Sequence, residues 1–309
     1  MSLTGDRFKK ADIHIHIMAS ANEGGFISRS LLSKPWSKYM SYWLGLESDT
    51  VEEYISRLVS YIRESPLDIG VILACDAIYD EHGEVDPRTS FFVPNDVVLK
   101  VAGTHEELLP GVSIHPNRKD ALEEIDRCVE AGAALLKWLP NTQVIDPSDK
   151  KYKAFYRKLS DYGLPLLSHS GFEFTMKAIN QRLGDPNKLR LALEEGTTVI
   201  SAHCGISYAG LSTRYLKTWL SLLKEYPTLY GDLAALSLGF GGRLIRKLLE
   251  NQIASERLVN GSDFPVPPLR TVIDIFRRSN PFIRDYQIKT TLGVPDSVFY
   301  RGYQLIRRQ

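Results

Sequence analysis

Short apolar, β-branched runs alternate with longer amphipathic runs along most of the chain. A short run of this kind predicts a buried strand and a longer run with a period near 3.6 predicts a helix, so the alternation predicts parallel strands joined by right-handed crossovers. Eight strands are predicted, at residues 11–18, 68–75, 110–115, 133–139, 164–169, 198–203, 228–233 and 257–263. Strand–helix units repeated in this way are typical of a (β/α)8 TIM barrel, which is the α/β fold that we expect.

Four of the intervening helices carry clear end signals. They are predicted at residues 50–63, 119–131, 151–162 and 216–225. Gly132 and Gly163 follow the second and third of these helices, and Pro227 follows the fourth. Glycine just after a helix and proline shortly beyond it are the usual termination signals, which supports these boundaries.

Two connections are longer than the repeating pattern needs, at residues 19–49 and 77–93. Both follow a strand, so we expect them on the face where barrels hold their active sites, as lids or substrate walls. The first contains a group of aromatic residues, namely Trp36, Tyr39, Tyr42 and Trp43. A short helix packed on the barrel, or a subunit contact in a homodimer, would explain this group equally well.

Composition fits a single domain that acts on a small molecule. The 309 residues are 43% hydrophobic and 24% charged, as in an ordinary globular protein, and barrels of roughly 200 to 400 residues form one domain. The 38 Lys and Arg nearly balance the 37 Asp and Glu, so the net charge of +1 provides no broad field for nucleic acid or an anionic membrane.

The first residues, MSLTGDRFKK, are charged, and the sequence has no apolar run long enough to span a bilayer, so we expect a cytoplasmic protein. Cys75, Cys128 and Cys204 are widely spaced and form no C-x-x-C pair. We therefore expect small buried side chains and neither disulfides nor a cysteine zinc site.

Five of the seven histidines fall at or near the C-terminal ends of predicted strands. His14 and His16 are two residues apart on one strand, so both imidazoles can point into the barrel mouth and share a cation. His169 and His203 end two later strands, and Asp263 ends the last one. An isolated His-x-His pair is often a coincidence, but polar groups at so many strand ends favour a metal site, and zinc accepts imidazole nitrogen readily.

Four short motifs together resemble a known family. They are His14-Ile-His16, Ser168-His169-Ser-Gly171, Ala202-His203-Cys-Gly205 and Gly261-Ser262-Asp263-Phe-Pro265. In this order they resemble the strand-one, strand-five, strand-six and strand-eight motifs of the amidohydrolase superfamily. The chain is most similar to the amidohydrolase-related branch (amidohydrolase 2), which includes aminocarboxymuconate-semialdehyde decarboxylase, and Pro94-Asn95-Asp96 before a helix also fits that branch.

The resemblance implies a set of metal ligands. His14, His16 and His169 would bind through nitrogen and Asp263 through its carboxylate, and a water could take a further position with its pKa lowered to about 7. Asp263 would act as general base and then acid, although an aspartate that stabilises a turn is the alternative. His203 would bind a second metal or polarise a substrate carbonyl, unless it is a buried histidine bonded to backbone.

Lys137 would be an unpaired charge in an apolar strand unless it reaches the barrel mouth. It matches the strand position at which binuclear amidohydrolases carry a carboxylated lysine between two metals. The motif set resembles the mononuclear branch, so we favour one divalent ion and an ammonium that holds a substrate carboxylate. Zinc is expected before manganese, although the ligand types suit both.

Further residues are candidates for contacts around the centre. Asp232 matches a strand-seven carboxylate that would orient a ligand histidine. The candidates for substrate contacts are Lys137, His115, Trp138, Glu173 and Arg243. A turn role before Pro116 explains His115 equally well, and the glycines at 239–242 lack the G-x-G-x-x-G pattern of a dinucleotide site.

These features favour a metal-dependent hydrolase of an ester, lactone or amide bond in a small carboxylated or aromatic metabolite. The first alternative is a non-oxidative decarboxylase that uses the same ligands. A metal-dependent deoxyribonuclease is disfavoured by the balanced charge and by Lys137-Trp138, where such enzymes show a Gly-Glu-x-Gly stretch. An inactive binding protein would have no physical reason to keep all four ligands.

Overall fold

The computed structural model describes residues 8–44, 50–207, 210–269 and 279–307. Eight parallel strands form one sheet in the order β1-β3-β5-β6-β7-β8-β9-β10. They are β1 (Ala11–His16), β3 (Ile69–Leu73), β5 (Leu108–Val112), β6 (Leu135–Trp138), β7 (Leu166–Ser168), β8 (Val199–Ser201), β9 (Leu229–Asp232) and β10 (Leu258–Val259). Each predicted strand is present, and each ends before its predicted C-terminal boundary.

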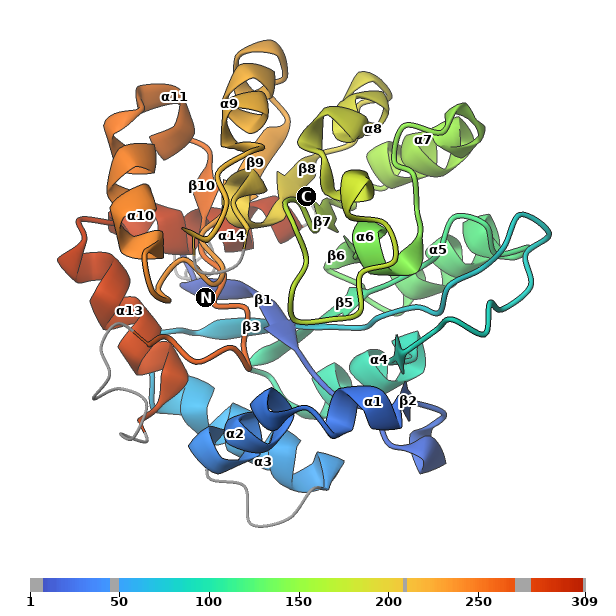
Figure 1. Ribbon diagram of the computed structural model, residues 1–309, viewed down its shortest axis with the longest axis horizontal. Coiled ribbons are helices and arrows are strands. Elements are labelled where there is room, and N and C mark those ends of the chain that lie inside the picture. Colours follow the sequence, from blue (N-terminus) through green and yellow to red (C-terminus); the bar gives the residue numbers. More distant parts are fainter. Residues whose placement is uncertain (1–7, 45–49, 208–209, 270–278, 308–309) are drawn as a thin grey trace, which may run out of the picture.

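Backbone hydrogen bonds between β1 and the end of β10 close the sheet. The amide of Ile13 donates to the carbonyl of Asn260 (3.2 Å), and the amide of His16 donates to the carbonyl of Phe264 (2.7 Å). Figure 1 shows the strands at the centre with the helices arranged around them. The predicted (β/α)8 barrel is therefore confirmed.

Helices surround the barrel in the expected alternation with strands. They are α3 (Val51–Arg63), α4 (Asn95–Thr104), α5 (Ala121–Glu130), α6 (Pro140–Gln143), α7 (Lys153–Asp161), α8 (Arg190–Glu194), α9 (Leu216–Glu225), α10 (Gly241–Glu250), α11 (Gln252–Ser255), α13 (Pro281–Thr291) and α14 (Asp296–Ile306). Short 3-10 turns are η3 (Lys150–Tyr152), η4 (Gln181–Gly184), η5 (Pro186–Leu189) and η6 (Ala202–Gly205). The four helices predicted with end signals correspond to α3, α5, α7 and α9. None of the described helices is long and apolar enough to cross a bilayer.

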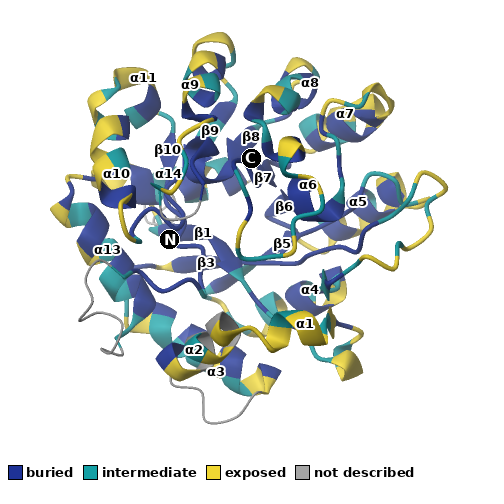
Figure 2. Ribbon diagram, in the orientation of Figure 1, coloured by how far each residue is buried: buried dark blue, intermediate teal, exposed yellow. Residues whose placement is uncertain are grey.

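The core has two parts because neighbouring strand residues point to opposite sides. Leu135 joins Leu167 and Ile200 in a smaller cluster formed mainly by strand residues, whereas Leu136 and Trp138 belong to the larger cluster shared with the helices. Figure 2 shows the buried strands enclosed by helices whose outer faces are exposed. The three cysteines are free and buried, as predicted.

The two long connections meet each other. The first forms η2 (Ala21–Glu23), β2 (Phe26–Ile27), α1 (Arg29–Leu32) and α2 (Pro35–Leu44), and the second contains β4 (Phe91–Phe92). β2 and β4 pair as antiparallel strands. In α2, Trp43 is buried in the core and Tyr42 is 49% exposed, while the side chain of Trp36 lies outside the described residues. The aromatic segment is therefore a helix packed on the barrel by one face.

Candidate metal centre

His14, His16 and Asp263 lie in direct contact at the barrel mouth. The Nε2 atoms of the two histidines are 3.2 Å apart, and each is 3.3 Å from Oδ1 of Asp263. Four ligands about 2.0–2.1 Å from a tetrahedral zinc ion are separated from one another by about 3.3 Å. The three atoms thus have the mutual spacing of ligands that share one cation.

Asp232 fixes the orientation of His14. Its Oδ2 lies 2.8 Å from Nδ1 of His14, which turns Nε2 of the same ring toward Asp263. Its Oδ1 accepts the backbone amides of His203 and Ala234. Burial alone would raise the pKa of the Asp232 carboxyl, but His14 and His203 together outweigh burial and hold the pKa well below its usual value. Asp232 is therefore a buried carboxylate that orients the imidazole of His14.

His169 presents a buried nitrogen that needs a partner. Its Nε2 has no hydrogen-bond partner in the described part of the chain, while its Nδ1 lies 3.5 Å from Oε2 of Glu173. Burial lowers the pKa of His169 well below its usual value, and His203 and Lys137 act in the same direction. A neutral imidazole with a free buried lone pair suits a metal cation, so the residues present fit the divalent ion that the motifs imply.

His203 lies between the other histidines. Its ring centroid is 5.4 Å from that of His14 and 5.1 Å from that of His169, and its Nδ1 lies 2.9 Å from the carbonyl oxygen of Ala234. Ligand atoms of His14, His203 and Asp263 all lie within 4.8 Å of one another. This group overlaps with the predicted ligand set but replaces His16 and His169 by His203. Nε2 of His16 also lies next to this group, 3.2 Å from Nε2 of His14 and 3.3 Å from Oδ1 of Asp263.

Lys137 reaches the same centre from β6. Its Nζ lies 2.8 Å from Nε2 of His14, and the side chain is almost completely buried. Burial lowers the pKa of Lys137 to about 8, although the charges of Asp232 and Asp263 oppose that shift. The expectation that this lysine points into the barrel mouth agrees with its position in the structure.

Backbone strain is concentrated around this centre. Asp263 has φ = 67°, and His203, Cys204 and Ala235 have φ between 54° and 60°. Residues other than glycine rarely adopt this left-handed region, and such strain is often found at functional sites. All four residues follow the C-terminal ends of β8, β9 or β10, so the strain lies in the loops that carry the polar side chains.

Trp138 lies away from the barrel mouth, contrary to its expected contact with substrate. It follows Lys137 on β6 and therefore points to the opposite side of the strand. Its indole packs against Phe155 and Tyr156, and its Nε1 donates to the carbonyl of Ile114 (2.8 Å). Trp138 is a core residue between the barrel and α7.

His115 has both ring nitrogens engaged. Nε2 lies 3.0 Å from the carbonyl oxygen of Gln143, and Nδ1 accepts the amide of Asn117 (3.1 Å). Burial lowers the pKa of His115 to about 4. A neutral ring with both nitrogens occupied stabilises the turn at Pro116, so the turn interpretation replaces the proposed substrate contact.

Glu173 faces a histidine, whereas the expected substrate contact of Arg243 stays a prediction. Oε1 of Glu173 accepts the amides of Thr175 and Met176, while Oε2 faces His169. Its contacts therefore orient a histidine. Arg243 is exposed in the first turn of α10.

Asp12 belongs to the centre and was missed in the sequence. Its Oδ1 accepts the amides of His14 and Ser262, each at 3.0 Å, so it joins β1 to the turn that carries Asp263. Burial raises the pKa of Asp12 to about 6. A charged residue in the apolar strand before His14 is the signal that could have identified it.

Comparisons with known proteins give a family match and several structures with the same fold. The family model described as Amidohydrolase matches residues 11–283. No curated protein matches the sequence. Among solved structures, an uncharacterized TIM-barrel protein from Bordetella bronchiseptica is similar with a TM-score of 0.62 and 15% identity, covering 92% of this chain and 99% of the other.

Two further structures share the fold. The IDCase of Metarhizium anisopliae has a TM-score of 0.58 at 12% identity, covering 95% of this chain and 94% of its own. A 5-carboxyvanillate decarboxylase from Novosphingobium aromaticivorans was solved with manganese and a nitrobenzoic acid. It has a TM-score of 0.52 at 10% identity, covering 96% of this chain and 98% of its own. At such identities the likeness extends to the fold alone.

Proposed function

The chain belongs to the amidohydrolase family, and from this premise we propose that it is a metal-dependent hydrolase that cleaves an ester, lactone or amide bond in a small metabolite. The observation that carries the proposal is the triangle formed by His14, His16 and Asp263, whose ligand atoms are 3.2–3.3 Å apart. His169 completes the proposed ligand set with its unpartnered Nε2.

A divalent cation bound by these residues would supply Lewis-acid polarisation and would make water more acidic. Asp263 is the proposed general base. Burial would raise the pKa of its carboxyl, but His14, His16 and His203 together hold it well below its usual value, so the group is an anion at neutral pH. It can accept a proton from water and later deliver it to the leaving group.

Access from solvent is on the side of His16 and Asp263, whose side chains are 23% and 13% exposed. The more deeply buried His203 and Lys137 would then lie on the inner side of a bound substrate. As an imidazolium, His203 would donate through Nε2 to a developing oxyanion, because its Nδ1 already donates to the carbonyl of Ala234. The Lys137 ammonium can hold a substrate carboxylate, which favours a carboxylated substrate.

Zinc is the proposed ion, because three imidazoles with one carboxylate suit it. Manganese is the alternative, since the same ligand types accept it and it is bound in the fold relative from Novosphingobium aromaticivorans. One ion is proposed, with Lys137 as an unmodified ammonium.

Decarboxylation is a second candidate. The buried Lys137 beside His14 could hold the carboxylate that leaves as carbon dioxide, and one fold relative is a decarboxylase by name. Both reactions would use the same ligands, so activity assays must separate them.

The test is a screen of the purified protein, stripped of metal and reloaded with zinc or manganese. Esters, lactones and amides of small carboxylic acids are assayed for hydrolysis, and aromatic acids are assayed for released carbon dioxide. We expect hydrolysis that depends on metal. Carbon dioxide release without hydrolysis would favour the lyase, and failure of the protein to bind either metal would contradict both reactions.

A further inference from the structure

Asp285 and Lys289 form a buried ion pair on α13, outside the proposed metal centre. Lys289 is 0% exposed and Asp285 is 4% exposed. Nζ of Lys289 donates to Oδ2 of Asp285 (2.6 Å), to Oδ1 of Asn260 (2.8 Å) and to the carbonyl of Gly261 (2.7 Å). An ammonium has three N–H donors, so all of them are used within the protein. Lys289 has no donor left for a substrate.

The contacts of Lys289 lead to the closure between β1 and β10. Asn260 accepts from Lys289 and donates through Nδ2 to the carbonyl of Ala11 (3.0 Å). The carbonyl of Asn260 also accepts the amide of Ile13. Lys289 therefore links α13 to both strands that carry the triangle of proposed ligands.

Gly261 is the second point at which Lys289 acts. A Cβ atom added to Gly261 would lie 2.8 Å from Cβ of His14, so its backbone packs directly on that histidine. Gly261 is also two residues before Asp263. A hydrogen bond to the Gly261 carbonyl thus fixes the stretch of backbone that packs on His14 and leads to Asp263.

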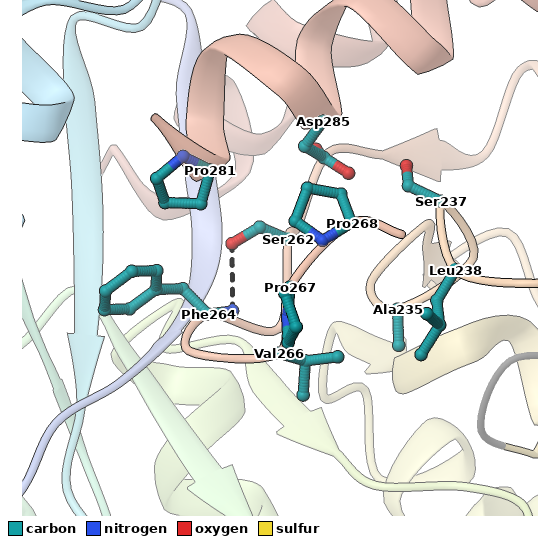
Figure 3. Close-up of a pocket in the computed structure, with 10 residues that line it drawn as sticks. All are labelled: Ala235, Ser237, Leu238, Ser262, Phe264, Val266, Pro267, Pro268, Pro281 and Asp285. Atoms are coloured by element: carbon teal, nitrogen blue, oxygen red, sulfur yellow. Dashed lines mark hydrogen bonds between the residues drawn. The ribbon is translucent and has the colours of Figure 1, made fainter. Parts of the chain in front are cut away.

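Phe264 adds a packing contact between this turn and α13. Its ring stacks on that of Phe282 with the centroids 5.2 Å apart, and both side chains are buried. A small cavity beside this contact is lined by Asp285 of α13 and Ser262 of the turn, among other residues (Figure 3). The hydrogen bonds from Lys289 therefore act together with this packing to hold the turn.

We propose that Lys289, with its charge balanced by Asp285, is a positioning residue that holds the turn of residues 261–263 at the distance from His14 that a shared cation requires. The inference rests on the proposed metal centre. A buried ion pair contributes little net stability compared with an apolar pair of similar volume. We therefore expect that apolar side chains can replace the pair without loss of the fold, although Oδ1 of Asn260 and the carbonyl of Gly261 then lose a donor.

The test is the double variant Asp285→Leu with Lys289→Met. Thr290→Val is the matched control, because Thr290 is the next residue on α13 and its hydroxyl donates to carbonyls of the same helix. Zinc affinity is measured by competition with a coloured chelator, ligand geometry by the absorption spectrum of the cobalt-loaded protein, and folding by thermal unfolding of the metal-free protein.

We expect the double variant to fold, with an unfolding temperature lowered by the lost hydrogen bonds to Asn260 and Gly261, and to bind zinc about 10- to 100-fold more weakly, as is found when groups that orient ligands are removed. Its cobalt spectrum should change, and the control should match wild type in all three measurements. Wild-type affinity and spectrum in the folded double variant would overturn the inference and leave the metal centre intact. Absence of metal binding in the wild type would instead contradict the proposed function.

If the double variant does not fold, the variant Gly261→Ala is used to test whether zinc binding needs a fixed turn. This change keeps the ion pair but places a methyl group against His14. Weakened zinc binding in that folded variant would support the need for a fixed turn. Unchanged zinc binding would overturn it.

Discussion

Two of the proposed ligands, His14 and His169, are each held by a polar neighbour that is itself buried. Asp232 contacts Nδ1 of His14, and Glu173 faces Nδ1 of His169, so the Nε2 atom of each ring is directed toward the centre. Such neighbours restrict the rotation of the imidazoles before any ion binds. The residues are thus arranged as a preformed site and do not need a large rearrangement to share a cation.

Single substitutions at Asp263 and His14 should separate proton transfer from metal binding. Asp263→Asn should keep the fold and some metal while lowering turnover by at least about 100-fold, because the amide cannot accept the proton. His14→Ala should lose metal as well, since it removes one corner of the triangle. Metal content by mass spectrometry and turnover of the same samples test both changes. Equal activity in wild type and Asp263→Asn would remove the proton-transfer role.

A second prediction concerns Trp138, which is fully buried between the barrel and α7. Trp138→Ala should lower the free energy of unfolding by about 3–5 kcal/mol through the cavity that it leaves. Urea unfolding of the metal-free protein measures the loss, and zinc affinity should stay near that of wild type. A change of less than about 1 kcal/mol would show that the indole is not a core residue.

The elements show which features the sequence could predict. Strand positions and the ends of α5 and α7 followed from apolar runs and from Gly132 and Gly163. The direction of Trp138 could also have been predicted, because it must point away from Lys137 on the same strand. The contribution of α13 could not be predicted, since Lys289 contacts Gly261 only in the folded barrel.

The start of α13 provides a test at this scale. Oδ1 of Asn280 accepts the amides of Phe282 and Ile283, and its Nδ2 donates to the carbonyl of Tyr61. Asn280→Ala should lower the free energy of unfolding by about 1 kcal/mol through loss of the N-cap. Asn280→Asp keeps the capping acceptor, so chemical denaturation should show a smaller loss. If alanine and aspartate cost the same, the cap is not the source of the effect.

The whole barrel brings together residues that are distant in the chain. His14 and His16 come from β1, His169 follows β7, and Asp263 follows β10, yet β1 and β10 are neighbours because the sheet closes. The sequence placed polar groups at strand ends, and the carboxyl ends of parallel strands share one rim. Side-chain directions, as for His115, depended on contacts from other loops and were beyond the sequence pattern.

Because the proposed ion would link the first and last strands, it should stabilise the whole fold. A cation that binds the native state alone adds about 2.7 kcal/mol at a free concentration 100 times its Kd. Thermal unfolding with added zinc should therefore occur at a higher temperature than after removal of metal by a chelator. His14→Ala is the control and should show no such difference. Equal unfolding temperatures of the wild-type protein with added zinc and after chelator treatment would argue against zinc binding to the native state.

The central claim is that one cation is shared by side chains from β1, β7 and β10. Anomalous diffraction at the zinc absorption edge, from crystals of the zinc-loaded protein, tests it most directly. The account predicts a single strong peak about 2.0–2.2 Å from nitrogens of His14, His16 and His169 and from an oxygen of Asp263. A peak at other residues, or none within reach of these four side chains, would contradict it.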